Sequence, residues 1–222
     1  MATGYFIAGT DTECGKTEVT LGLMQLLQST GRRVAGMKPV ASGAQPTSDG
    51  LRNDDALRIQ AQCSRSTAYS LVNPYAFEPP IAPHLAARHA GVEIEFGVIG
   101  RTLEVLAADA DLVVVEGVGG WRVPLGKEGD LSNMARDLGL PVVLVVGVRL
   151  GCINHALLTA DAIVTSGVPL AGWVANLIDP AMLALEDNLS TLEERLPAPK
   201  LGVVPWLSPP APHRVAEHLR LP

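Results

Sequence analysis

The segment Gly9-Thr-Asp-Thr-Glu-Cys-Gly-Lys-Thr17 follows a short apolar run and opens a run with helical spacing, and this order indicates the fold. Glycine-rich turns between a strand and a helix expose backbone N–H groups that bind phosphate, and the helix N-terminus adds positive potential. Lys16 can then reach the β- and γ-phosphates, and the Thr17 hydroxyl can hold Mg²⁺. Five residues separate Gly9 from Gly15, whereas the standard P-loop has four. The other interpretation is a plain turn with a surface lysine, which Gly-Lys-Thr in this context disfavours.

Short apolar runs recur along the chain between longer segments with helical spacing. This pattern is typical of a parallel sheet covered by helices on both faces, and the clearest run is Val142-Val-Leu-Val-Val146. We therefore expect residues 1–222 to form a single α/β domain with a P-loop NTPase fold, a mainly parallel sheet flanked by helices on both faces. The expected strands are 5–8, 33–37, 112–115, 142–146, 170–175 and 201–204.

The first expected helix starts directly after the phosphate loop and ends at Gly31. The others are 53–62, 97–108, 131–138, 153–164 and 180–196. Asp130 is the expected cap of the helix 131–138, and Asp179 precedes Pro180 at the first position of the last helix.

The composition fits one well-buried domain and excludes several classes of function. Hydrophobic residues make up 47% of the chain and charged residues 18%, which is enough apolar surface for a core. A net charge of -6 leaves no broad basic surface for nucleic acid or an anionic membrane. The three cysteines lack metal-binding spacing and fit a reducing compartment. With no secretion signal and no membrane-spanning apolar run, we expect a soluble cytoplasmic protein.

A second lysine, Lys38, stands at the end of the strand 33–37, within Met37-Lys-Pro-Val-Ala-Ser-Gly43. In doubly wound sheets the carboxyl ends of the strands form the ligand crevice, so Lys38 and Ser42 should lie near the phosphate loop. The alternative is a solvated lysine before a proline turn, which would be the better interpretation if Lys38 stood without the phosphate loop.

Acidic residues occur at two places where they could accompany a metal ion. Glu116 follows the strand 112–115, where P-loop proteins commonly have a carboxylate associated with Mg²⁺. Asp54 and Asp55 stand near the start of the helix 53–62, where the helix dipole alone explains acidic residues. Together with Thr17 and Glu116, a carboxylate from this pair would complete a magnesium site made of hard oxygen ligands.

Two further positions have both a functional and an ordinary interpretation. The segment Gly147-Val-Arg-Leu-Gly-Cys-Ile-Asn-His155 leads from a strand into a helix, whose N-terminal amides could bind a carboxylate or simply form a turn. Asn176 ends the strand 170–175 and could recognise an adenine edge or stabilise a turn.

In their order along the chain, these segments resemble the dethiobiotin synthetase family. The resemblance covers the chain from about residue 5 to Trp206. It rests on Gly9 to Thr17, Lys38 to Gly43, Gly50 to Asn53, Val72 to Tyr75, Val115 to Trp121, Gly151 to His155 and Gly172 to Asn176. The five-residue spacing of the phosphate loop matches that family. Gly126 to Asp130 and the tail after Trp206 match no signature.

The resemblance implies a homodimeric, Mg²⁺-dependent ligase of biotin biosynthesis that joins CO₂ to 7,8-diaminopelargonate with cleavage of ATP. A carbamate and a carbamic-phosphoric anhydride would be its intermediates, and Lys16 and Lys38 its catalytic residues. The implied metal-associated residues are Thr17, Asp55 and Glu116. The implied nucleotide-binding residues are Thr12, Glu13, Cys14, Gly15, Lys16, Thr17, Glu116 and Asn176. The implied substrate-binding residues are Thr12, Lys38, Ser42, and, across the dimer interface, Gly151, Cys152, Ile153 and Asn154.

Two other classes of P-loop protein fit this sequence less well. A nucleotide-gated switch or partitioning ATPase would carry a second lysine early in the phosphate loop or a membrane-binding basic face, whereas this loop carries Asp11 and Glu13. An amide-forming enzyme acting on a corrin precursor would normally be joined to a glutaminase module, for which the sequence offers no room.

Overall fold

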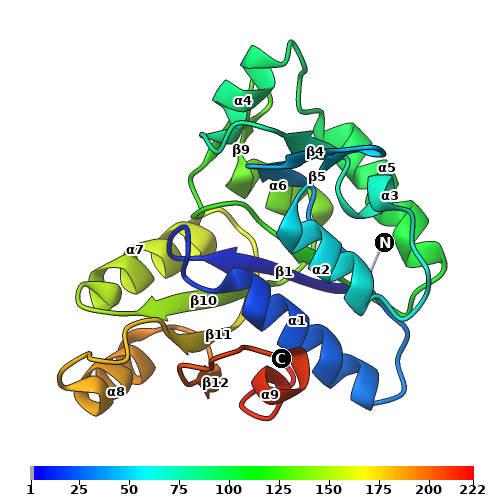
Figure 1. Cartoon of the computed structure of the whole chain (residues 1–222). Coiled ribbons are helices and arrows are strands. Elements are labelled where there is room, and N and C mark those ends of the chain that lie inside the picture. The colour runs from blue at the N-terminus through cyan, green and yellow to red at the C-terminus, as the bar shows by residue number, and fades with distance from the viewer. Residues whose placement is uncertain (1–2) are drawn as a thin grey trace.

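The central sheet has six parallel strands, and the phosphate loop leaves from its middle (Figure 1). The computed structural model describes residues 3–222, so Met1 and Ala2 of the expected single domain lie outside the described residues. The strands are β1 (Gly4–Gly9), β2 (Val34–Met37), β7 (Leu112–Glu116), β10 (Val142–Val148), β11 (Leu170–Leu177) and β12 (Lys200–Val204). Their order is β12-β11-β10-β1-β7-β2. All six predicted strands and the parallel sheet are confirmed.

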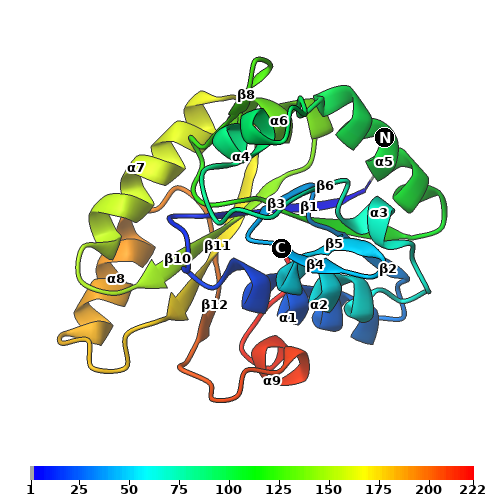
Figure 2. The same cartoon turned by 45° about the horizontal axis from the view of Figure 1, so that its top comes forward.

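Helices cover both faces of this sheet, as Figure 2 shows from a second side. One face carries α1 (Lys16–Ser29), α2 (Asp54–Gln62) and the short α9 (Pro212–Ala216). The other face carries α5 (Phe96–Ala108), α6 (Leu131–Leu138), α7 (Cys152–Thr165) and α8 (Leu185–Arg195). In residues 3–222 the helices are all too short or too polar to cross a membrane.

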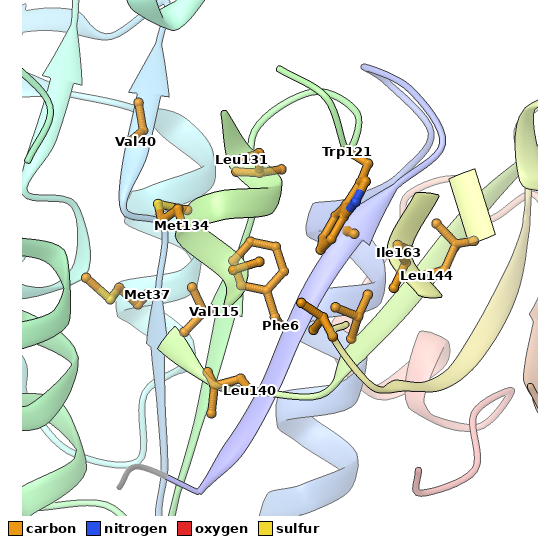
Figure 3. Packing of buried hydrophobic residues seen from close by; sticks show 14 of the residues in the cluster. Phe6, Met37, Val40, Val115, Trp121, Leu131, Met134, Leu140, Leu144 and Ile163 are labelled. Carbon is orange, nitrogen blue, oxygen red and sulfur yellow. The ribbon is translucent and has the colours of Figure 1, made fainter. Parts of the chain in front are cut away.

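Alternating side chains of the strands supply the two cores beneath these helices. Phe6 packs into one core and Ile7 into the other, because successive side chains of a strand point to opposite faces. Both faces are therefore apolar, which explains the strands without polar alternation. The Phe6 ring meets Trp121 edge to face, with ring centroids 6.3 Å apart (Figure 3).

Within residues 3–222, three small two-stranded sheets and three short helices lie outside the sequence-based expectations. The helices are α3 (Tyr69–Val72), α4 (Pro83–His89) and α9. The sheets pair β3 (Val40–Ser42) with β6 (Tyr75–Phe77), β4 (Gln45–Thr47) with β5 (Gly50–Arg52), and β8 (Pro124–Gly126) with β9 (Gly129–Asp130). The segment 126–130, which matched no signature, thus belongs to a short hairpin.

The helix ends confirm two predictions and correct a third. Asp130 caps α6 in a full capping box, and Gly31 follows the end of α1 with a φ of 81°. The expected start of the last helix at Pro180 is wrong, because α8 begins at Leu185. Asp179 instead accepts a hydrogen bond from the backbone N–H of Ala181 at 3.0 Å, which stabilises a local turn in place of a helix.

Candidate active site

The register of three strands brings Lys38 and Glu116 together at the carboxyl end of the sheet. Met37 of β2 pairs with Val115 of β7, so the next residues of the two strands lie level with each other. Glu116 also pairs with Ile7 of β1, the strand that leads into the phosphate loop. The Lys38 ammonium accordingly lies 2.5 Å from Glu116 Oε1.

A buried charge cluster forms around this pair. Lys38 Nζ lies 2.9 Å from Asp55 Oδ2, and the Thr17 hydroxyl donates to Glu116 Oε1 at 2.9 Å. Burial by itself would lower the pKa of Lys38, but the charges and hydrogen bonds of Glu116 and Asp55 outweigh it and raise this pKa above 10.5. Burial would likewise raise the pKa of Asp55, but Lys38 outweighs it and the pKa lies below 3.8. Lys38 is therefore a permanent cation at neutral pH.

The phosphate loop is held in shape from within and from β11. Gly15 has a φ of 88° and caps the N-terminus of α1, while Lys16 Nζ donates to the carbonyl of Asp11 at 2.7 Å. The Asn176 side chain donates its Nδ2–H to the carbonyl of Cys14 at 3.0 Å. A Cβ atom on Gly15 would lie 1.9 Å from that Asn176 nitrogen, so the approach of the Asn176 side chain and the positive φ both favour glycine.

A cavity of about 700 Å³ opens at this end of the sheet. Nine of the predicted site residues line it: Thr12, Glu13, Gly15, Lys16, Thr17, Lys38, Ser42, Asp55 and Glu116. It also includes residues that the sequence did not predict for the site: Glu18, Asn53, Arg58, Pro80, Ile81, Ala82, Pro83, Val118, Gly119 and Val123. Of these, Asn53, Val118 and Gly119 stand in segments that carry the family resemblance. Glu18 and Arg58 each stand within one helical turn of a predicted metal-associated residue. The other five carried no signal.

The remaining predicted residues lie outside the lining of this cavity. The Cys14 side chain is buried, with its sulfur 3.9 Å from Lys16 Nζ, so only its backbone can face a nucleotide. Gly151 caps α7 with a φ of 93°. The segment 151–154 therefore stands at the start of a helix and does not enter this chain's cavity. A salt bridge of 2.7 Å between Asp11 and Arg149 joins the phosphate loop to the residues before α7.

Comparison with known proteins identifies the family. A model described as an AAA domain matches residues 3–214. The ATP-dependent dethiobiotin synthetase BioD of Pseudomonas paraeruginosa is 59% identical over 98% of this chain and 96% of its own length. The protein of the same name from Aromatoleum aromaticum is 52% identical over 98% of this chain and 97% of its own length. The chain belongs to the dethiobiotin synthetase family. It is thus an enzyme of a family of ATP-dependent ligases that form carbon–nitrogen bonds.

Solved structures agree with the P-loop NTPase fold. The septum site-determining protein MinD of Pyrococcus horikoshii, in complex with Mg-ADP, aligns with a TM-score of 0.59 over 99% of this chain and 87% of its own. The two are only 14% identical, so the likeness concerns the fold alone. The dethiobiotin synthetase family thus shares its architecture with proteins of other functions, and the site has to be argued from its residues.

The donors around the charge cluster fit a magnesium ion. Glu116 Oε2 is buried and has no hydrogen-bond partner among residues 3–222. Within that same range no group of three His, Cys, Asp or Glu side chains could hold a metal. The Asp55 and Glu116 carboxylates and the Thr17 hydroxyl could supply part of the oxygen ligands of Mg²⁺. Nucleotide phosphates and water commonly complete the coordination of this ion.

Proposed function

We propose that this chain closes 7,8-diaminopelargonate and CO₂ into dethiobiotin with the cleavage of ATP to ADP and phosphate, in the biotin pathway of the cytoplasm. One amine of the substrate adds to CO₂ and loses a proton to give a carbamate. A carbamate oxygen then attacks the γ-phosphorus of ATP, which releases ADP and leaves a carbamic-phosphoric anhydride. The second amine attacks the carbamoyl carbon, expels phosphate and loses a proton as the five-membered ring closes.

The observation that carries this proposal is the convergence of Lys16 and Lys38 on one cavity beside a phosphate loop. The reaction needs no covalent enzyme intermediate, but it needs negative charge on the carbamate and phosphoryl oxygens to be neutralised. The ammonium group of Lys38 lines the cavity, so it can pair with the carbamate oxygens. Lys16 and the amides of the phosphate loop would align the transferring phosphoryl group.

Thr17, Asp55 and Glu116 would hold the Mg²⁺ ion. When bound, this ion neutralises the charge on the phosphate oxygens. Ser42 and Thr12 would contact the diamine substrate, and the buried Ser42 Oγ supports this role because it has no hydrogen-bond partner in residues 3–222. Its hydroxyl is therefore free to bond a ligand in the cavity.

Asn176 would read the adenine base, alongside the nucleotide contacts of Thr12, Glu13, Cys14 and Gly15. Its Nδ2 is committed to the Cys14 carbonyl, which leaves the acceptor Oδ1 for an amino group such as that of adenine.

A second copy of the chain would complete the substrate site. The amides of Gly151, Ile153 and Asn154 stand at a helix start and would receive the substrate carboxylate of the partner. Cys152 would contribute to the shape of this turn, because its N–H already donates to the Arg149 carbonyl at 3.0 Å. Leu150 is 92% exposed and Leu158 on α7 is 62% exposed, which supports a protein interface on this helix. We therefore propose a homodimer.

The test is phosphate release by the purified protein with ATP and Mg²⁺. Release should require diaminopelargonate and bicarbonate together, and dethiobiotin should form in equal amount. Equal release without the diamine would refute the proposed ligation and favour a plain ATPase.

A further inference from the structure

A two-pronged ion pair joins α1 and α2 beside the charge cluster. Arg58 Nη1 donates to Glu18 Oε1 at 2.7 Å, and Arg58 Nη2 donates to Glu18 Oε2 at 2.8 Å. A bidentate pair of this kind fixes both the distance and the orientation of its partners. Both side chains also line the cavity.

The positions of the two residues connect this ion pair to the proposed magnesium ligands. Glu18 directly follows Thr17 in the first turn of α1, and Arg58 stands three residues after Asp55 on α2. Residues three apart share a face of a helix, so Arg58 and Asp55 both face α1. The ion pair therefore lies next to both Asp55 and Thr17, which are joined through Lys38 and Glu116.

The other end of the two helices is joined independently. Gln62 Nε2 donates to Gln28 Oε1 at 2.8 Å, and Gln28 Nε2 donates to the Gln62 carbonyl at 2.6 Å. Between the two ends, Ile59 is fully buried in the core that α1 and α2 share. Figure 1 shows the two helices side by side. Loss of the Glu18–Arg58 pair should therefore loosen the end of α2 near the site and leave the helix in place.

We propose that Glu18 and Arg58 are positioning residues that hold the Asp55 carboxylate at the distance from Thr17 required for binding a divalent metal ion with nucleotide. This inference rests on the proposed magnesium site. Both terminal nitrogens of Arg58 are engaged by Glu18, so Arg58 acts through the helix and need not contact the nucleotide.

The experiment measures Mn²⁺ binding in the presence of ADP, by electron paramagnetic resonance, in Arg58→Met, Glu18→Gln and the double variant. Each single variant should weaken Mn²⁺ binding about 1.5- to fivefold, the range that corresponds to the energy of a partly exposed ion pair. The double variant should be no weaker than either single one, because both lose the same contact. Arg58→Lys, which keeps the charge without the two-pronged geometry, should fall between wild type and Arg58→Met.

The matched control is Arg33→Met, which removes an ion pair to Asp111 of 2.7 Å at the opposite end of the sheet. It should lower the melting temperature to a similar extent and leave Mn²⁺ binding unchanged. In the synthetase assay, Arg58→Met should raise the Mg²⁺ concentration for half-maximal rate, with little change of kcat at saturating Mg²⁺.

Three results would overturn the inference. The first is unchanged Mn²⁺ binding in Arg58→Met, and the second is losses that add in the double variant. The third is weaker binding of ADP without metal in Arg58→Met but not in Glu18→Gln, which would indicate direct contact of Arg58 with phosphate. If the wild type lacks synthetase activity, the proposed function fails, whereas Mn²⁺ binding still tests this inference.

Discussion

Replacing Lys38 with methionine removes the cation at the centre of the charge cluster. The Lys38 side chain is 7% exposed and that of Glu116 is 0% exposed, so the substitution leaves a buried carboxylate without its counter-ion. Removing one partner of a buried pair costs about 3–5 kcal/mol. The Thr17 hydroxyl still donates to Glu116, which favours the lower end, about 3 kcal/mol. Domains are commonly stable by roughly 5–15 kcal/mol, so the variant should remain folded.

The stability deficit of Lys38→Met should depend on pH. In the wild type the pKa of Asp55 lies below 3.8 and that of Lys38 lies above 10.5, so their pair is fully charged between these values. The stability contributed through Asp55 is present above pH 3.8 and is lost as pH falls through its lower folded pKa. The deficit should therefore be largest near neutral pH and shrink in acid.

Urea unfolding at pH 7 and at acid pH measures this deficit, and phosphate release with both substrates measures turnover. We expect turnover to fall by about 10²- to 10³-fold, the loss seen when one preorganised electrostatic donor is removed. Arg33→Met serves as the control for loss of an exposed ion pair. Undiminished turnover, or a deficit under about 1 kcal/mol at neutral pH, would refute the reasoning.

Two further predictions concern single positions. Gly15→Ala should weaken nucleotide binding in a calorimetric titration, because its Cβ would lie 1.9 Å from Asn176 Nδ2 and would displace that side chain from the Cys14 carbonyl. Gly31→Ala, with a φ of 81° and nothing within 4 Å of its Cβ, should strain only the backbone and still bind nucleotide. Equal nucleotide affinity in the two variants would contradict the role of β11 in shaping the loop. Hydrogen bonds from Arg33 hold the pKa of Asp111 at about 2, so the stability of this pair should be present above pH 3.8 and lost as pH falls through 2. An NMR titration should give that pKa in the wild type and a higher value, still below 3.8, in Arg33→Met, because the backbone N–H of residue 33 keeps its hydrogen bond to Asp111.

Local sequence signals predicted the elements that depend on nearest neighbours. The strand Val142–Val148 could be predicted because it is apolar on both faces. The role of Asp130 as a helix cap could be predicted because a cap bonds to backbone groups within one helical turn. The prediction that a helix starts after Asp179 was wrong. An aspartate side chain can bond to nearby backbone N–H groups in a turn as well as at a helix start, and Asp179 does so in a turn. The short hairpin that includes Gly126–Asp130 could not be predicted, because its strands are too short to show an alternation of apolar and polar residues.

The phosphate loop, the parallel sheet and the family could be predicted from the amino-acid sequence, because these depend on residue types at short spacing. The contact of Lys38 with Glu116, 78 residues away, could not be predicted, since it follows from the register of β2 and β7 in the folded chain. The engagement of Asn176 with the Cys14 carbonyl and of Arg58 with Glu18 likewise depends on how separate elements pack. Short-range propensities do not encode such distances, because pairing register and helix packing are set by the whole core.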